Sequence, residues 1–249
     1  MRYFFTPEQA LPAGVGFQPL GWAHLLMLTG LTVLIAALVA LGCRMEQRNR
    51  LRMLRGISVF MVVMELLKDL ILAVQGAFDL GYLPLHLCSI DMFICLYWAY
   101  HPEREGGGQC LYSLGLSGGV AALLFPDWWN MPLWHFQSLH SFVYHALLVA
   151  VPLIAVISGM VRPRLREVWR PMLFLVAVAV PVCGLNRLLG TNYMFLQAPV
   201  PGTPLDWCAK CPGGYLLGYG LLAAAVLCLL DLPFSLWAWG KKQRQIRRK

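Results

Sequence analysis

The residues best suited to chemistry stand together in one apolar stretch, residues 83–91 (LPLHLCSID). An imidazole, a thiol and a carboxylate occur there within two helical turns, at His86, Cys88 and Asp91. Ionisable groups inside an apolar segment are costly, so they indicate a functional site. On a helix, Cys88 and Asp91 share a face with Cys95, whereas His86 lies about 160° around the axis from Cys88. His86 is therefore not the expected partner of Cys88.

A thiol becomes a nucleophile when a neighbouring base or cation stabilises its anion. Two apolar segments later the chain offers such a base, His145, which shares a helical face with Ser138 and Ser141. We therefore expect Cys88 to act as a nucleophile and His145 as its general base. The alternative stays open that Cys88 is a small buried hydrophobe, as free cysteines commonly are.

The carboxylate of Asp91 needs a partner in this scheme. If it were ionised and unpaired one turn from Cys88, it would oppose formation of the thiolate. We therefore expect Asp91 to pair with Arg187 or Lys68.

Further polar groups interrupt other apolar segments. Glu65, Lys68 and Asp69 are spaced i, i+3 and i+4, so they share one helical face and predict an internal ion pair, which either is structural or orients a catalytic group. Asn186, Arg187 and Asn192 are candidate donors to a developing oxyanion. The supporting or substrate-binding candidates are, in chain order, Glu65, Lys68, Asp69, His86, Asp91, His140, Asn186, Arg187, Asn192 and Tyr193.

The composition shows which elements must position these groups. The chain has 249 residues, is 59% hydrophobic and only 13% charged, and its charges are bunched between long apolar runs. A membrane-spanning helix takes roughly 20 apolar residues. Seven stretches qualify, at about 20–43, 54–75, 83–100, 110–126, 138–160, 171–189 and 213–239. The sequence thus predicts an all-α, polytopic seven-transmembrane helical bundle over residues 20–240, preceded by an external interfacial segment, 1–19, and followed by a basic tail, 241–249.

The basic residues set the expected orientation. Most of the 20 Lys and Arg fall in the loops after the first, third and fifth spans and in the tail. In a seven-span bundle, these three loops and the tail all lie on the same side of the membrane. The positive-inside rule puts that side in the cytoplasm, with the N-terminus outside. The candidate site then lies in the outer half of the membrane. We expect a multi-pass protein of a cell membrane, such as the bacterial cytoplasmic membrane, with lipids as partners; the net charge of +8 indicates anionic headgroups and no nucleic acid.

Several blocks carry a resemblance to a known family. The run LPLHLCSI at 83–90, FPD at 125–127, His145, NRLLGTNYMFL at 186–196 and DLPF at 231–234 together resemble the YwaF-like family of integral membrane proteins. That family is similar to an animal transmembrane acyltransferase that moves polyunsaturated acyl chains onto ether lysophospholipids with a cysteine and a histidine. The resemblance implies that Cys88 and His145 take these roles. The loop before the last span departs from the family pattern, with Cys208 and Cys211 in it.

Three functions follow as hypotheses. The first is a lipid acyltransferase that works through a thioester on Cys88 and needs neither metal nor cofactor. The second is a zinc-dependent lipid hydrolase with His86, His140 and His145 as ligands, since three protein ligands and an open position suit catalytic zinc. The third is a small-solute transporter, which is disfavoured because the sequence lacks a detectable internal repeat.

Overall fold

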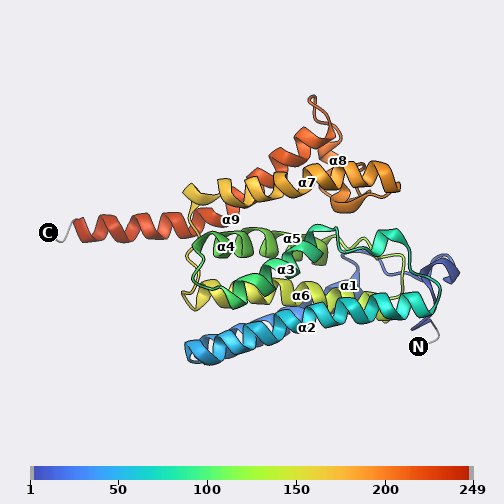
Figure 1. The fold of residues 1–249 in the computed structure, drawn as a ribbon, viewed down its shortest axis with the longest axis horizontal. Coiled ribbons are helices and arrows are strands. Elements are labelled where there is room, and N and C mark those ends of the chain that lie inside the picture. Colours follow the sequence, from blue (N-terminus) through green and yellow to red (C-terminus); the bar gives the residue numbers. More distant parts are fainter. Residues whose placement is uncertain (1–2, 247–249) are drawn as a thin grey trace.

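The fold is helical throughout the part of the chain that the computed structural model describes, residues 3–246, which contains no strand. Residues 1–2 and 247–249, including the last three basic residues of the predicted tail, lie outside the described residues. The long helices are α1 (Trp22–Arg44), α2 (Gln47–Val74), α3 (Leu87–Tyr100), α6 (Phe136–Ile157), α7 (Trp169–Leu189) and α9 (Tyr215–Ile246). Between them lie α4 (Glu105–Cys110), a π-helical segment η3 (Leu111–Gly115), α5 (Leu116–Leu124), α8 (Leu205–Cys208) and the 3-10 turns η1 (Glu8–Ala10), η2 (Leu80–Tyr82), η4 (Leu165–Glu167) and η5 (Tyr193–Phe195). The long helices run along one common direction, and the two termini lie at opposite ends (Figure 1).

Five helical segments in the described residues are long and apolar enough to cross a membrane. They are Trp22–Arg44, Leu80–Tyr100, Phe136–Ile157, Leu165–Leu189 and Tyr215–Leu236. The all-α prediction is confirmed, and five of the seven predicted spans correspond to these segments. The other two differ for local reasons: α2 carries three charges in its second half, and the predicted span at 110–126 is divided among α4, η3 and α5.

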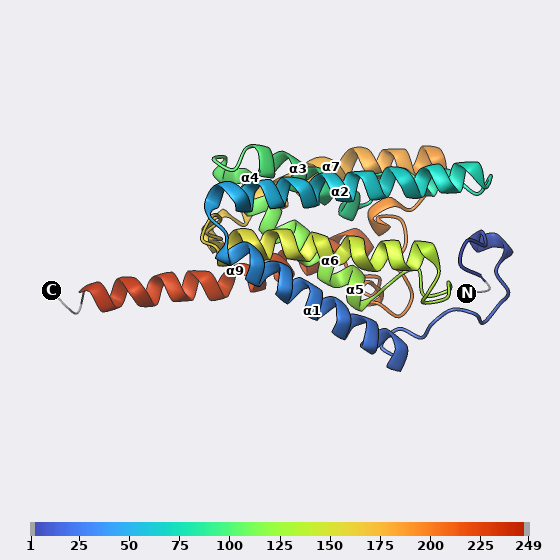
Figure 2. The same ribbon diagram turned by 90° about the horizontal axis from the view of Figure 1, so that it is seen from below.

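Helix α6 forms the centre of the bundle. Within its apolar window 72% of the residues are buried by protein, against 11% for α1 and 17% for α7. Helices α1, α2, α3 and α5 pack around it (Figure 2). The outer helices instead expose large apolar side chains, among them Leu26 on α1 and Val180 on α7. Tyr144 and His145 of α6 are accordingly buried by protein.

Glycine permits the close approach of α5 to α6. A Cβ on Gly119 would lie 2.8 Å from Val149 Cγ2 and 3.2 Å from the carbonyl oxygen of His145. A larger residue at Gly119 would push the two helices apart, and overpacking of this kind typically costs about 1–3 kcal/mol. Gly118, on the same helix, faces Asp91 of α3, with the Cβ position 3.1 Å from Oδ2. The close packing of α5 thus determines the surroundings of both His145 and Asp91.

The N-terminal segment is tied to the helix ends by backbone groups. The amide of Phe136 donates to the carbonyl oxygen of Phe4 at 3.1 Å. The amide of Phe17 donates to the carbonyl oxygen of Trp129 at 2.9 Å. The side chain of Gln75 donates to the carbonyl of Phe5 at 2.9 Å. The segment expected to lie at the membrane interface therefore also covers the ends of α2 and α6.

The start of α3 differs from the predicted span. The helix begins at Leu87, and His86 is its N-cap with an extended backbone (φ −72°, ψ 153°). Upstream, the amide of Leu85 donates to the carbonyl of Leu83 at 2.7 Å, which closes a tight turn around Pro84. Pro84 therefore does not stand in the first helical turn, and the angular relation between His86 and Cys88 on a helix does not apply.

Candidate functional site

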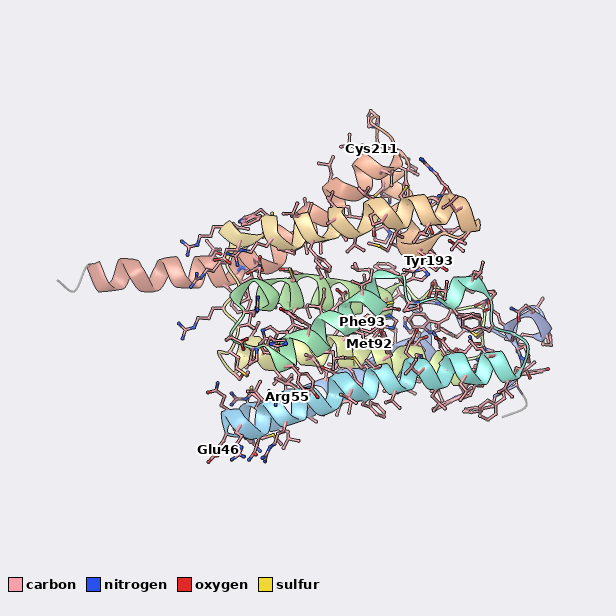
Figure 3. The ribbon with its side chains drawn as sticks, in the orientation of Figure 1. Glu46, Arg55, Met92, Phe93, Tyr193 and Cys211 are labelled. Carbon is pink, nitrogen blue, oxygen red and sulfur yellow. The ribbon has the colours of Figure 1, made fainter. Side chains whose placement is uncertain are left out.

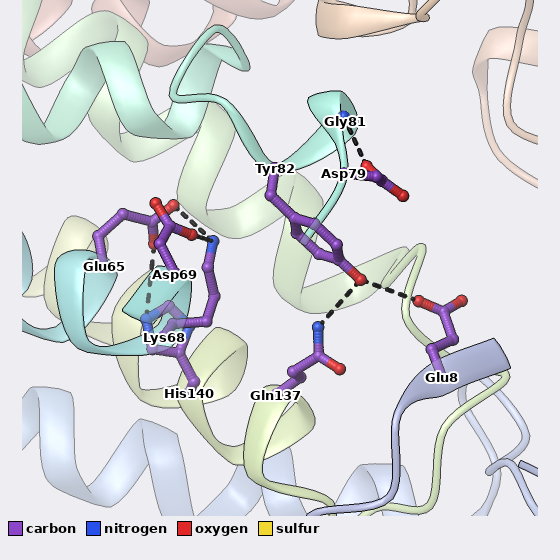
Figure 4. A network of polar contacts seen from close by, with 9 residues as sticks. All are labelled: Glu8, Glu65, Lys68, Asp69, Asp79, Gly81, Tyr82, Gln137 and His140. Atoms are coloured by element: carbon purple, nitrogen blue, oxygen red, sulfur yellow. Dashed lines mark hydrogen bonds and ion pairs between the residues drawn. The ribbon is translucent and has the colours of Figure 1, made fainter. Parts of the chain in front are cut away.

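A cluster of charged side chains joins α2 to α6 at the end of the bundle that carries the N-terminus (Figure 4). Lys68 Nζ lies 2.7 Å from Glu65 Oε1 and 3.3 Å from Asp69 Oδ1, so the predicted ion pair is present. On the other side of Glu65, His140 Nε2 of α6 lies 3.5 Å from Oε2. These side chains are 10–23% exposed. We call Glu65, Lys68, Asp69 and His140 the charged cluster.

The charged cluster continues towards the N-terminal segment through Tyr82. Lys68 Nζ lies 5.6 Å from the centre of the Tyr82 ring, which is a cation–π contact. The Tyr82 hydroxyl donates to Glu8 Oε2 at 3.4 Å and accepts from Gln137 Nε2 at 3.2 Å (Figure 4). Polar groups from the N-terminal segment, α2, η2 and α6 therefore form one network.

Tyr144 links α6 to the backbone of Cys88. Its hydroxyl donates to the carbonyl oxygen of Cys88 at 3.1 Å. The Tyr144 ring stacks on that of His140 with centroids 5.6 Å apart. It also contacts the His145 ring edge-on, with centroids 5.3 Å apart. A continuous path of contacts thus leads from Glu65 through His140 and Tyr144 to Cys88, with His145 beside it.

The ring of His145 is held in a defined orientation. Its Nδ1 lies 2.7 Å from the carbonyl oxygen of Ser141, and its ring stacks on Trp128 at 5.2 Å with 12° between the planes. A carbonyl oxygen can only accept, so Nδ1 carries a proton and donates. In the neutral imidazole, Nε2 is then the unprotonated nitrogen, which is the form a general base requires.

Asp91 does not form the ion pair expected from the sequence. It is 1% exposed, and neither carboxyl oxygen has a hydrogen-bond partner in the described part of the chain. Lys68 is engaged by Glu65 and Asp69, while Arg187 is an exposed residue in the last turn of α7. An ionised carboxylate buried without a partner is very costly, so the environment favours the neutral acid at Asp91.

The residues after α7 form a loop that packs on the start of α3. The Asn186 side chain, 1% exposed, donates to the carbonyl of Tyr193 at 3.0 Å and accepts from the Tyr193 amide at 2.8 Å and from Thr191 Oγ1 at 3.0 Å. The Tyr193 hydroxyl donates to the carbonyl of Leu80. The His86 ring meets those of Tyr193 and Phe195 at 5.4 and 5.5 Å, so His86 belongs to this loop contact.

Asn192 shapes the same loop from its solvent side. Its carboxamide donates to the carbonyl of Ala198 at 2.9 Å and accepts from the amides of Gln197 and Ala198 at 2.9 and 3.3 Å. The hydrogen bonds of Asn186 and Asn192 therefore all serve the loop, and the exposed Arg187 lies apart from it. These contacts indicate a structural role for the two amides and give no support to the oxyanion role expected from the sequence.

We predict that Asn186→Ala lowers the thermal stability of the purified protein more than Asn192→Ala does. The first change leaves the buried backbone groups of Tyr193 without partners, at about 1–3 kcal/mol for each group. The second is the matched control, because the groups that it releases reach solvent. Thermal unfolding in detergent measures both, and equal losses would contradict the structural role of Asn186.

A cavity of about 590 Å³ opens beside this loop. Its lining includes Asp79, His86, Asp127, Thr191 and Tyr193. Asp127 follows α5 and contributes to the wall of this cavity. Removal of water by the surrounding protein raises the pKa of Asp127, and the nearby Glu8 carboxylate adds to the rise.

Two other histidines have structural roles. His24 Nδ1 accepts from the amide of Leu20 at 2.9 Å, and its Nε2 lies 3.0 Å from the carbonyl of Leu123. His135 Nδ1 accepts from the amide of Gln137 at 3.2 Å, and its Nε2 lies 2.8 Å from the carbonyl of Thr6. Both rings use both nitrogens to hold chain segments together. No group of three His, Cys, Asp or Glu side chains in the described residues is arranged to hold a metal ion, so the zinc hypothesis gains no ligand set.

Sequence reasoning missed Trp128, Tyr82, Gln137 and Glu8 as members of the polar network. Trp128 is only 7% exposed and is a buried neighbour of His145. Its position directly after Asp127 is a signal that could have linked it to the site. Glu8 gave no such signal, because its partners lie far away in the sequence.

The comparisons with known proteins decide the family. The model of the TMEM164 family matches residues 19–231. The chain belongs to the TMEM164 family. No curated protein and no solved structure matches it.

The TMEM164 family match begins just before α1 and extends into α9, so it includes the charged cluster, Cys88, His145 and the loop after α7. It leaves out the N-terminal segment that holds Glu8 and Thr6. Together with the five apolar helices, membership in this family makes the chain a multi-pass membrane protein.

Proposed function

We propose that this TMEM164 family member is a lipid acyltransferase in which Cys88 is the nucleophile and His145 the general base. The observation that carries the proposal is the hydrogen bond from Tyr144 to the Cys88 carbonyl. Because the His145 ring contacts the Tyr144 ring, with centroids 5.3 Å apart, this bond supports an arrangement in which the imidazole stands close to the start of α3. The defined tautomer of His145 adds a free Nε2 to that arrangement.

The proposed reaction passes through a thioester. His145 Nε2 takes the thiol proton, and the Cys88 sulfur attacks the ester carbonyl of a donor phospholipid. The ester C–O bond breaks, and the protonated imidazole returns its proton to the leaving alkoxide, so that a lysophospholipid departs. His145 then takes the proton of the acceptor lysolipid hydroxyl, this oxygen attacks the thioester, and the sulfur leaves and recovers its proton.

Other residues support this chemistry through position and charge. The stacked Trp128 ring holds His145 in one orientation, and Ser141 holds its tautomer. A neutral Asp91 does not oppose the thiolate, which removes the reason for expecting an ion pair there. Glu65 and His140 contact Cys88 only through Tyr144, so we regard them as positioning residues.

We further propose seven membrane passes, with the N-terminus outside and the site towards the outer leaflet of a cell membrane. Helix α2 has 28 residues, which span about 42 Å and exceed the roughly 30 Å of the hydrocarbon core. Inside the protein, Lys68 partly compensates the carboxylates of Glu65 and Asp69. Helices α4, η3 and α5 are contiguous and act as one further pass. Arg55 and Glu46 lie at the end where α2 begins, away from Tyr193 (Figure 3), and the arginines of that end favour a cytoplasmic location.

Trapping the thioester tests the function directly. The full-length protein in lipid nanodiscs would be incubated with a phospholipid labelled in its acyl chain, without acceptor, and quenched in acid. We expect one acyl chain per protein, released by hydroxylamine and mapped to the peptide that contains Cys88. Acyl transfer to a lysophospholipid without any acyl-protein species, or label on another cysteine, would overturn the proposal.

A further inference from the structure

A second cavity lies at the opposite end of the bundle, where α3 ends and the α6–α7 loop passes α4. Its volume is about 280 Å³, and Trp98, Arg104, Gln109, Arg162, Arg164 and Glu167 contribute to its lining. Neither Cys88 nor His145 belongs to it. The proposed acyl transfer therefore assigns no role to this cavity.

The inner wall of this cavity is closely packed. A Cβ on Gly108 would lie 2.9 Å from Val161 Cγ2 and 3.3 Å from Trp98 Nε1, so only glycine lets α4 pack this closely. Trp98 is 1% exposed and Val161 7%. Close packing around the cavity can hold its lining side chains in a binding geometry before a ligand arrives.

Gln109 fixes the rim of the cavity to the rest of the bundle. Its Nε2 donates to Asp231 Oδ2 of α9 at 2.6 Å and to Ser113 Oγ at 3.1 Å. Its Oε1 accepts from the backbone amide of Arg164 at 3.1 Å. Gln109 thus ties the backbone of Arg164 to α4, while its other bonds reach η3 and α9.

The charge around the cavity is strongly positive. Glu167 is its one acidic lining residue, and the guanidinium groups of Arg164, Arg166 and Arg170 lie 3.3, 4.0 and 3.5 Å from its carboxylate. Arg104 and Arg162 also line the cavity, and neither makes an ion pair with a side chain that the structure describes. Several guanidinium groups therefore share a single carboxylate.

Trp98 offers the cavity an N–H donor. Trp98 donates no hydrogen bond from Nε1 to any described residue, although its side chain is almost fully buried and lines the cavity beside Gly108. An indole N–H can only donate, so it suits a bound ligand that presents a hydrogen-bond acceptor. An acceptor surrounded by arginines is an anion.

We propose that this cavity binds the phosphate of an anionic lipid headgroup. Arginine is the residue best suited to phosphate, because its planar fork donates two parallel hydrogen bonds. The volume suits a phosphodiester with a small alcohol and is too small for acyl chains. Helix α7 starts two residues after Glu167 and exposes Leu173, Val176 and Val180, which gives the chains of such a lipid an apolar surface to lie on. The proposal is independent of the proposed acyl transfer.

Binding of short-chain lipids to the full-length protein tests this site. The purified protein in a nonionic detergent, in about 0.15 M salt so that distant charges are screened, would be titrated with dihexanoyl phosphatidylglycerol, dihexanoyl phosphatidylcholine and inorganic phosphate. We expect saturable binding of phosphatidylglycerol, at least about tenfold tighter than that of phosphatidylcholine. Absence of saturable phosphatidylglycerol binding would overturn the proposal, and inorganic phosphate binding equally tightly would overturn its lipid part.

Variants distinguish the cavity from general attraction to a basic surface. Arg104→Gln/Arg162→Gln should weaken phosphatidylglycerol binding about tenfold or more, because both guanidinium groups line the cavity. Arg48→Gln/Arg52→Gln removes the same charge from exposed positions on α2 and should change binding less than about threefold. Trp98→Phe keeps an aromatic side chain but removes the indole N–H, and should weaken phosphatidylglycerol binding a fewfold. Equal losses in the two double variants would refute a site in this cavity.

Discussion

Replacement of Cys88 by alanine is expected to reduce acyl transfer by about a thousandfold or more, with little change in the fold. The variant lacks the atom that would carry the acyl group, and removal of a catalytic nucleophile leaves only the contributions of binding and orientation. Cys88 is only partly buried, so the loss of its sulfur leaves a small defect. Proteoliposomes with a labelled donor phospholipid and an unlabelled lysophospholipid acceptor provide the measurement.

Cys183→Ala is the matched control for this experiment. Cys183 is also partly buried, but it lies on α7 and belongs to the cluster around Val182 and Tyr193. Its replacement should leave acyl transfer within about twofold. If Cys88→Ala kept wild-type activity, the thioester mechanism would be wrong whatever the control showed.

A double variant asks whether Cys88 and His145 act as one unit. Residues of a nucleophile–base pair are strongly non-additive, because removing either one disables the same step. Cys88→Ala/His145→Ala should therefore be no less active than Cys88→Ala alone. A double variant whose loss equals the product of the two single losses would indicate that His145 acts independently of the thiol.

The features predicted correctly from the sequence are those that depend on local spacing. Long apolar runs predict helices, and the spacing of Glu65, Lys68 and Asp69 predicts an ion pair within one helix. In each case the partners stand within one or two turns, so the helix itself brings them together.

Contacts between distant segments could not be predicted from the sequence, above all where a backbone atom is the partner. Tyr144 binds the carbonyl of Cys88, and any residue in that position would offer the same oxygen. The pairing of Asp91 was wrong because Arg187 turns to the exposed side of α7, which depends on tertiary packing. His86 lies outside α3 because a turn around Pro84 delays the start of the helix.

The charged cluster has the largest expected effect on stability. Lys68→Met should destabilise the protein by about 3–5 kcal/mol, because Glu65 and Asp69 would lose the cation that compensates them in a poorly hydrated interior. His140 alone remains near Glu65, at 3.5 Å. Thermal unfolding of the purified variant and its yield in the membrane provide the measurement, and an unchanged melting temperature would show that the ion pair contributes little.

The triple variant Glu65→Gln/Lys68→Met/Asp69→Asn then separates structure from function at the same position. It removes the cation and both carboxylates together, so no uncompensated charge remains, and replacing a whole buried ion pair by neutral groups is often neutral in stability. We therefore expect it to recover most of the stability that Lys68→Met loses. Because His140 contacts Tyr144 and Tyr144 holds the Cys88 carbonyl, loss of Glu65 should still lower acyl transfer in the recovered protein. A stable triple variant with full activity would restrict the charged cluster to helix packing.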